Sequence, residues 1–271
     1  MTFNSHRARK RFGQHWLKDE DILNRIIKSA LLEDKDSVLE VGPGRGALTE
    51  KLVQSNASNI HCIEIDKDLV EGLRKRFENN KKLTFQSGDI LNDLLEFREG
   101  ILPNKVVANI PYNITGPLLD KLLGSLSAPT VNPYELLVLL MQREVAERIL
   151  AKPGQSSFSA LSVRIQLLAD CSSVCLVPPR CFQPPPKVVS QVIKIVPFLP
   201  SQRIDPVLAL RVESFLKTAF RSRRKMLRNT LVNLRPLPEL EKLAHASGIN
   251  LSQRPQELAP SSWLALAEIW N

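Results

Sequence analysis

A short apolar segment that runs into a glycine-rich turn constrains this chain more than any other feature. Residues 37–41 have the composition of a buried strand, and glycines follow at positions 42, 44 and 46, just before a helical pattern over residues 47–54. Glycine adopts positive φ angles and lets a ligand approach the backbone closely. Because ligands of open α/β sheets bind at the carboxyl ends of the strands, we expect a binding site at this turn.

Strand and helix patterns alternate over residues 19–150. Strands are predicted over residues 37–41, 60–65, 83–86, 105–108 and 135–141. Helices are predicted over residues 19–32, 47–54, 67–78, 117–123 and 143–150. This alternation is typical of an α/β fold, a Rossmann-like parallel sheet with helices on both faces. After a predicted helix over residues 159–169, two more strands, over residues 174–177 and 189–196, are expected at the sheet edge.

The chain changes character after Pro197-Phe-Leu-Pro200. Every later pattern is helical, over residues 206–219, 224–234, 238–246 and 261–270. We therefore predict two domains, a catalytic domain over residues 1–199 and a small all-helical domain over residues 200–271.

Basic charge is concentrated in two places. The chain carries 37 Lys and Arg against 28 Asp and Glu, a formal charge of +9. One basic cluster is formed by Arg7, Arg9, Lys10 and Arg11, and the denser one by Arg221, Arg223, Arg224, Lys225 and Arg228. Such clusters favour a polyanion such as RNA, because neutralised phosphates release counterions. A solvated helix face, or a transit peptide for the first cluster, is the alternative.

Composition excludes several protein classes. A hydrophobic fraction of 43% is too high for a disordered chain, and the longest apolar run, residues 136–141, is far shorter than the ~20 residues of a membrane span. No apolar signal-peptide core follows the N-terminus. Cys171, Cys175 and Cys181 have irregular spacing and no paired histidine, so no metal site is expected. We predict a cytoplasmic protein, monomeric and without a membrane partner.

Glu64 supports a nucleoside ligand at the glycine turn. It follows Gly44 by 20 residues, at the end of the next predicted strand, where its two oxygens can accept both ribose hydroxyls. The glycine spacing differs from that of dinucleotide-binding turns, and Glu40 just before the turn favours a cationic ligand. This pattern resembles the first motif of S-adenosylmethionine-dependent methyltransferases. Asp89 then fits a contact to an adenine amino group, or otherwise a helix N-cap.

Asn109-Ile110-Pro111-Tyr112 directly follows a predicted strand. Pro111 ends the strand and exposes backbone carbonyls. The Asn109 side-chain oxygen and a carbonyl near Ile110 can hold both hydrogens of an adenine amine and turn its lone pair toward a methyl donor. Tyr112 can stack on the base. The alternative is a strand that simply ends in a proline turn.

These segments together resemble the ribosomal RNA adenine dimethyltransferases of the KsgA type. The resemblance rests on residues 9–17, 42–46, 64–66, 89, 109–113, 177–188 and 220–225. It implies that the cofactor S-adenosylmethionine is bound by His15, Leu17, Gly42, Gly44, Glu64, Asp89 and Asn109. The family usually has Asn at the position of His15 and Phe at that of Trp16.

The resemblance also implies a substrate. Members transfer two methyl groups to each of two adjacent adenosines near the 3′ end of small-subunit ribosomal RNA, in an assembling subunit. Phe182, in a proline-braced loop, is then expected to be the second stacking wall for a base swung out of its helix, with a core aromatic as the alternative. The basic cluster at 221–228 is expected to hold the RNA backbone.

Three other functions remain open on the sequence. A resistance-type methyltransferase that modifies one large-subunit adenosine has similar motifs. A ribosome assembly factor could retain the fold without catalysis, although intact Glu64, Asn109 and Tyr112 argue against it. A DNA adenine methyltransferase usually carries Asp where Asn109 stands.

Overall fold

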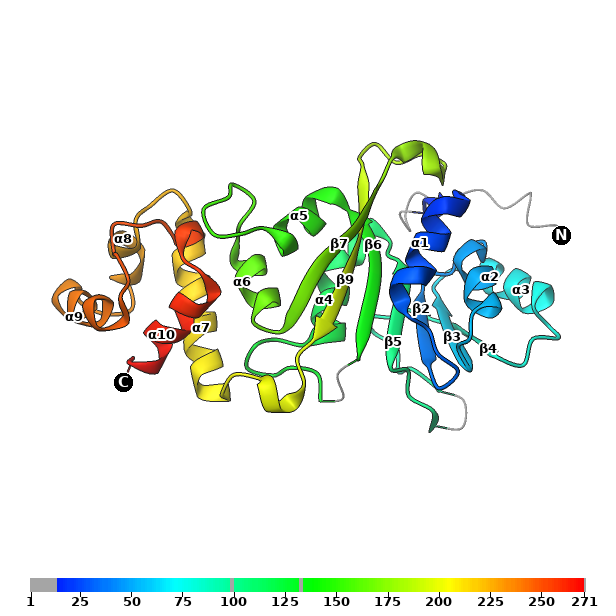
Figure 1. The fold of residues 1–271 in the computed structure, drawn as a ribbon, viewed down its shortest axis with the longest axis horizontal. Helices are drawn as coiled ribbons and strands as arrows, with labels where there is room; N and C mark the ends of the chain where they lie inside the picture. The colour runs from blue at the N-terminus through cyan, green and yellow to red at the C-terminus, as the bar shows by residue number, and fades with distance from the viewer. Residues whose placement is uncertain (1–13, 98–99, 132–133, 271) are drawn as a thin grey trace. The chain divides into compact units, whose positions relative to one another are not determined.

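A seven-stranded mixed sheet with flanking helices forms the centre of the first part of the chain (Figure 1). The computed structural model describes residues 14–97, 100–131 and 134–270, so the predicted basic cluster at residues 7–11 lies outside it. The strands lie in the order β4-β3-β2-β5-β6-β9-β7. Their bounds are β2 (Ser37–Val41), β3 (Asn59–Glu64), β4 (Leu83–Ser87), β5 (Lys105–Asn109), β6 (Leu136–Gln142), β7 (Ala169–Val177) and β9 (Ser190–Pro197). The predicted α/β class is confirmed.

The register of the sheet explains where a site can form. Strands β4, β3, β2, β5 and β6 run parallel, and β9 is antiparallel to β6. Val41 pairs with Ile63, and Asn109 pairs with Leu140, so these strands end at the same edge. The glycine turn, Glu64 and the 109–112 turn therefore start from neighbouring strand ends.

Helices cover both faces of the sheet, α1 in front and α4 behind in Figure 1. The helices of this part are α1 (Glu20–Ala30), α2 (Ala47–Gln54), α3 (Lys67–Arg76), α4 (Thr115–Leu123), α5 (Arg143–Leu150) and α6 (Ala160–Gln166). Asp19 begins α1 by accepting a hydrogen bond from the Ile22 amide at 3.1 Å. Apolar residues of α1 and α2, such as Leu23, Ile26 and Leu52, pack with alternate strand residues into one core.

The predicted helix over residues 159–169 ends earlier, at Gln166, and β7 begins already at Ala169. Strands β7 and β9 lie side by side at the sheet edge, as predicted. A second, two-stranded sheet was not predicted: β1 (Trp16–Leu17) pairs antiparallel with β8 (Phe182–Gln183). Each of these strands has only two residues, which is too short to show a periodic pattern of apolar residues. The strands are therefore defined only by their pairing with each other.

The later part of the chain is helical, as predicted. It contains α7 (Pro206–Ala219), α8 (Leu227–Leu231), α9 (Leu237–Ser247) and α10 (Pro260–Glu268). Single 3₁₀ turns occur at Tyr112–Ile114, Pro179–Cys181, Pro200–Gln202, Phe220–Ser222 and Pro255–Glu257. No helix in the described residues combines the length and the apolar character that crossing a membrane requires.

The chain divides into two compact units that interleave in sequence. The first unit runs to Leu122 and resumes over Asn132–Ala146 and Cys171–Pro197; the second contains Leu123–Val131, Glu147–Asp170 and the chain from Phe198 onward. The chain passes from the first unit to the second for the last time between Pro197 and Phe198, within two residues of the predicted boundary after residue 199. Helix α6 belongs to the second unit because it packs against α7 and α10, a pairing that sequence position does not reveal. The functional roles of the predicted domains stay a prediction.

Candidate functional site

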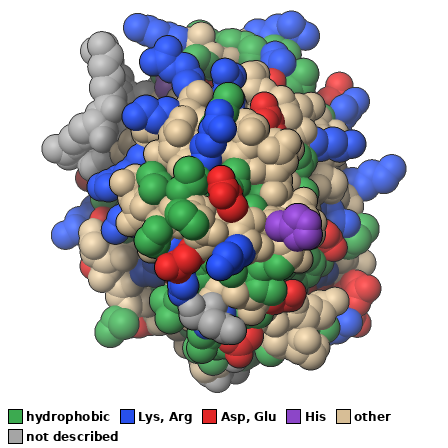
Figure 2. All heavy atoms as spheres, turned by 90° about the vertical axis from the view of Figure 1, so that its left-hand side faces the viewer, with side chains coloured by type: hydrophobic (Ala, Val, Ile, Leu, Met, Phe, Trp, Pro, Cys, Tyr) green, Lys and Arg blue, Asp and Glu red, His purple; other side chains and the backbone are tan. Residues whose placement is uncertain are grey.

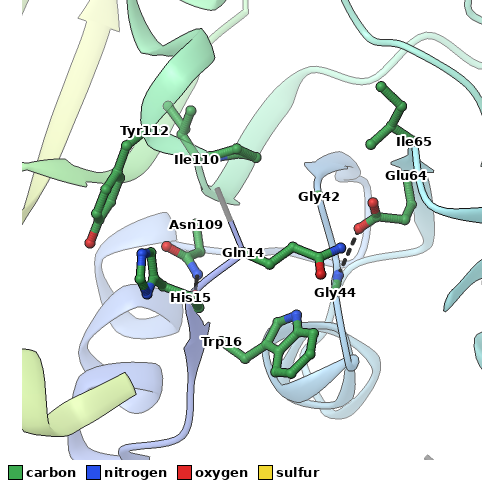
Figure 3. Close-up of a pocket in the computed structure, with 11 residues that line it drawn as sticks. Gln14, His15, Trp16, Gly42, Gly44, Glu64, Ile65, Asn109, Ile110 and Tyr112 are labelled. Carbon is green, nitrogen blue, oxygen red and sulfur yellow. Dashed lines mark hydrogen bonds between the residues drawn. The ribbon is translucent and has the colours of Figure 1, made fainter. Parts of the chain in front are cut away.

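A pocket opens at the carboxyl edge of the parallel strands (Figure 3). Three segments supply its walls: the chain just before and within β1, the glycine turn with the end of β3, and the turn after β5. Its lining residues are Gln14, His15, Trp16, Gly42, Gly44, Glu64, Ile65, Asn109, Ile110, Pro111 and Tyr112. The structure thus brings together two motifs that lie more than 60 residues apart in sequence.

The glycine turn requires glycine for two reasons. Gly42 and Gly44 have φ angles of +67° and +58°, which side chains rarely adopt. A Cβ atom on Gly44 would also lie 2.6 Å from Cδ1 of Trp16, so the indole packs directly on the backbone. On the ring of Trp16, the guanidinium carbon of Arg45 lies 4.0 Å from the centroid. The turn is therefore a rigid, close-packed floor.

Glu64 is held with its carboxylate at this floor. Its two oxygens accept hydrogen bonds from the backbone amides of Gly44, at 3.1 Å, and Asp66, at 3.0 Å. Burial raises the pKa of Glu64, and these two amides counteract part of that rise. A carboxylate has about four lone-pair sites, so acceptors remain for two ribose hydroxyls. Together with the close approach allowed at Gly42, this geometry fits the nucleoside part of S-adenosylmethionine.

The orientation of the Asn109 amide is fixed by a carbonyl. Its Nδ2 atom donates to the backbone oxygen of His15 at 3.1 Å. Because a carbonyl only accepts, the nitrogen must face His15, and the side-chain oxygen is left as an acceptor in the pocket. This is the orientation that the predicted role of Asn109 requires.

Tyr112 begins the 3₁₀ turn that follows Pro111. Its hydroxyl lies 2.5 Å from Oγ of Ser190 on β9. Burial raises the pKa of Tyr112, so the phenol stays protonated at neutral pH. Its ring stacks on the imidazole of His15, with 5.6 Å between the centroids and an interplanar angle of 26°. Both ends of the side chain are thus fixed.

Glu40 lies beneath the glycine turn and is only 1% exposed. Thr49 donates its hydroxyl to the carboxylate at 2.7 Å, and the Cys62 thiol lies at 3.4 Å. Burial raises the pKa of Glu40 to about 7, and the nearby Glu64 carboxylate acts in the same direction. The buried carboxyl of Glu40 therefore keeps its proton to a higher pH than an exposed glutamate does.

Three predicted site residues do not line the pocket. Leu17 and Phe182 pair across the small β1–β8 sheet and pack into the apolar core, with Phe182 only 2% exposed. Asp89 accepts hydrogen bonds from the Leu91 amide at 2.9 Å and from Asn92 Nδ2 at 2.7 Å, so its carboxylate stabilises a turn at residues 90–92, and no helix of the described residues begins there for it to cap. In this structure Phe182 is a core aromatic, and its stacking role stays a prediction that would require β8 to move.

The pocket includes residues that motif reasoning gave no role. Gln14 donates its Nε2 to Asp66 Oδ2 at 3.2 Å, and its side chain lies between Asn109 and Glu64 in Figure 3. Trp16 and Ile65 also line the wall. In the sequence, these residues are adjacent to His15 or Glu64, which is a sign that they lie near the site. Adjacency alone does not show whether a side chain points into the pocket.

The basic cluster of the second unit is not uniform. All five basic residues are exposed, Arg221, Arg223, Arg224, Lys225 and Arg228, but they differ in their hydrogen bonds. Arg223, predicted to bind RNA with them, instead donates to the backbone oxygens of Ser156 at 2.6 Å and Phe158 at 2.9 Å. Figure 2 shows Lys and Arg side chains spread over the face it draws, with apolar groups between them. RNA binding by the cluster stays a prediction.

A comparison with protein families identifies the family of the chain. The profile of the family described as ribosomal RNA adenine dimethylase matches residues 5–271. The chain belongs to the ribosomal RNA adenine dimethylase family. As a member, it is an rRNA methyltransferase that uses S-adenosylmethionine, which confirms the predicted cofactor.

Individual relatives agree with the family. The ribosomal RNA small subunit methyltransferase A of Parasynechococcus marenigrum (strain WH8102) is 60% identical over 271 residues, which cover 100% of this chain and 90% of the relative. The protein of the same name from Prochlorococcus marinus (strain MIT 9303) is 59% identical, covering 100% and 97%.

Solved structures extend the likeness to the fold. A dimethyladenosine transferase from Plasmodium falciparum superposes with a TM-score of 0.80 at 28% identity, covering 93% of this chain and 96% of that one. The 23S rRNA methyltransferase ErmE superposes with a TM-score of 0.73 at 26% identity, covering 93% and 98%. The Rossmann-like methyltransferase fold predicted from the sequence is confirmed.

Proposed function

We propose that this enzyme dimethylates the N6 amines of two adjacent adenosines near the 3′ end of small-subunit ribosomal RNA, in an assembling subunit. The observation that carries the chemistry is the fixed Asn109 amide. Its oxygen, beside the ring of Tyr112, is an acceptor suited to an exocyclic amine.

The difficulty of the reaction lies in the nucleophile. The lone pair of an adenine amine is conjugated into the ring, so the amine attacks poorly. When bound, S-adenosylmethionine would supply an electrophilic methyl group, and its sulfonium sulfur would keep the carbon–sulfur electron pair and leave as a neutral thioether. In the first transfer, the Asn109 oxygen and the Ile110 carbonyl hold the two amine hydrogens, turn the lone pair out of the ring plane and stabilise the positive charge that develops on nitrogen. In the second transfer, the Asn109 oxygen holds the one hydrogen that remains. The alkylated nitrogen then loses a proton to solvent.

Other residues bind the cofactor, the base and the RNA backbone. Glu64 accepts the ribose hydroxyls of the cofactor, and the glycine turn allows its close approach. Tyr112 stacks on the base, a contact worth ~1–3 kcal/mol by analogy with single-strand binders. The exposed basic side chains between residues 221 and 228 hold the RNA backbone, so that phosphate contacts position the substrate and the pocket selects the base.

The choice of the small subunit is supported by the curated relatives. Those at 56–60% identity over the full chain carry the name ribosomal RNA small subunit methyltransferase A. ErmE, a 23S rRNA methyltransferase, has a similar fold at 26% identity, so large-subunit RNA is the second candidate substrate. We further propose that the enzyme acts as a monomer in the cytoplasm, where its substrate is assembled.

Methyl transfer from a labelled donor to under-methylated ribosomal subunits tests the proposal. We expect label in small-subunit RNA, and mass spectrometry should locate dimethyladenosine at two adjacent positions near the 3′ end. Asn109→Ala is the control, with ribosome binding retained and transfer lost. Label found only in large-subunit RNA would favour the second candidate. Subunit binding without any transfer would identify an assembly factor.

A further inference from the structure

The imidazole of His15 occupies the position opposite Tyr112. The two rings stack at a centroid distance of 5.6 Å, and Nδ1 of His15 lies 2.9 Å from the backbone oxygen of Pro184. Because that oxygen only accepts, Nδ1 carries the proton of this hydrogen bond. The imidazole is therefore held from the side of β8 while its face is turned to Tyr112.

Both rings are anchored next to the reacting group. The backbone oxygen of His15 accepts the hydrogen bond from Asn109 Nδ2, and the Tyr112 hydroxyl contacts Ser190. Figure 3 shows the side chains of His15, Asn109 and Tyr112 grouped at one end of the pocket. An adenine whose amine reaches the Asn109 oxygen must therefore lie close to both rings.

Phe182 does not compete for this position in the structure. Its side chain is 2% exposed and belongs to the apolar core that also includes Leu17. His15, in contrast, is half-buried and lines the pocket. Of the aromatic groups considered for the second wall, the imidazole is the one that already faces Tyr112.

We propose that His15 and Tyr112 are the two walls of the target-base slot, and that the imidazole stacks on the adenine during methyl transfer. This inference rests on the proposed function, because it assigns a contact to its substrate. The two rings stack on each other in this structure, so they must separate by the thickness of one base, ~3.4 Å, to admit the adenine.

The imidazole must move to open this slot. A side-chain hydrogen bond to Pro184 positions the ring, and His15 precedes a strand of only two residues. Before the base enters, the stack of the two rings keeps Tyr112 in place and covers its apolar face. The slot is therefore closed in this structure and opens by a local shift of the imidazole.

Three variants of His15 separate the possible roles of its side chain. His15→Phe keeps an aromatic ring and removes the hydrogen bond to Pro184. His15→Asn keeps a hydrogen-bonding group and removes the ring, and His15→Ala removes both. If stacking matters, His15→Ala and His15→Asn each lower kcat/KM for RNA roughly 10-fold, and His15→Phe recovers most of that loss. The cofactor contact that the family resemblance implies for His15 survives these changes if the backbone makes it, so affinity for S-adenosylmethionine, measured by calorimetry, is expected to stay unchanged in all three.

A fluorescent base gives a readout that does not need catalysis. The probe is a small-subunit RNA fragment with 2-aminopurine at the target position, which lacks the amine at C6 and is quenched by stacking. Complexes of the wild type and of His15→Phe should be dimmer than those of His15→Ala and His15→Asn. Equal fluorescence in all four complexes overturns the inference, as does a loss of quenching in Phe182→Leu but not in His15→Ala.

The two proposals can fail separately. A wild-type enzyme that transfers no methyl group to small-subunit RNA defeats the proposed function, whatever the fluorescence shows. A wild-type enzyme that does transfer methyl groups, with His15→Ala equally active and equally quenched, defeats only the role of His15. Reduced affinity for S-adenosylmethionine in His15→Ala, with normal quenching, would make His15 a cofactor contact and also overturn it.

Discussion

The pocket at the sheet edge and the basic segment 221–228 were both predicted from sequence, but the structure treats them differently. In the pocket, Asn109 and Glu64 are fixed by hydrogen bonds in the orientations that their proposed roles require. In the basic segment, Arg223 is exposed like its basic neighbours, but it donates to two backbone carbonyls. A carbonyl and a phosphate oxygen are both acceptors for guanidinium, so charge density alone does not reveal which cations serve the fold.

The largest expected effect tests the fixed orientation in the pocket. Asn109→Ala removes the acceptor for the adenine amine, and we expect kcat to fall about 100- to 1,000-fold, the range seen when one transition-state hydrogen bond is removed. Asn109→Asp keeps an acceptor oxygen and removes the donation to His15, so its activity should be intermediate. Single-turnover kinetics with saturating cofactor measure both. An alanine variant with near-normal kcat would remove Asn109 from its assigned role.

Glu40 tests whether the buried groups beneath the turn reduce stability. Its folded pKa of about 7 lies above the ordinary value of 4.5, so the folded state binds more protons in this window, and stability falls as pH rises through it. The loss amounts to about 3 kcal/mol between the two pKa values. In Glu40→Gln this dependence should disappear, as measured by urea unfolding of the cofactor-free protein across that range. Parallel pH curves for variant and wild type would contradict the assignment.

Arg223 separates structural from RNA-binding cations. Arg223→Ala leaves the carbonyls of Ser156 and Phe158 without their donor, and we expect a loss of about 1 kcal/mol in unfolding free energy, reduced by the exposure of the site. Arg224→Ala is the matched control, expected to leave thermal stability nearly unchanged. Equal stability of the two variants would show that the Arg223 hydrogen bonds contribute nothing measurable.

The smallest effect concerns the salt dependence of RNA binding. Neutralising Arg221 and Arg224 together should lower the slope of log affinity against log salt concentration by about 1.4, close to 0.7 for each lost phosphate contact. Arg223→Gln should leave the slope unchanged, since its guanidinium is engaged within the protein. Fluorescence anisotropy over a salt series measures this. A slope that all three arginines affect equally would remove the distinction drawn between them.

Most of the fold could be predicted because periodicity is a local signal. The helices at residues 47–54, 143–150 and 206–219, and the strand at residues 37–41, have the bounds that the sequence predicts. The β1–β8 pair could not be predicted, because Trp16 and Gln183 are brought together only by the fold. The same holds for α6, which packs in the second unit although strands of the first unit follow it.

The site divides in the same way. Gly42, Glu64, Asn109 and Tyr112 were predictable because each lies at or just after the carboxyl end of a parallel strand, and parallel strands end at one edge. Phe182 and Asp89 were not: an aromatic residue in a proline-rich loop can face a pocket or the core, and an aspartate after a strand can bind a ligand or cap a turn. The burial of Phe182 and the hydrogen bonds of Asp89 are tertiary facts.

By itself, the sequence determined the α/β class, the edge of the sheet where the candidate site lies, and the residue types proposed to bind a nucleoside and hold an amine. It did so because backbone geometry and hydrogen-bonding capacity are properties of single residues and short segments. Only the tertiary structure decided that the His15 carbonyl fixes the Asn109 amide, that an imidazole faces Tyr112, and that Arg223 serves the fold. Each of these depends on which distant partner a side chain meets, and that choice is made by packing.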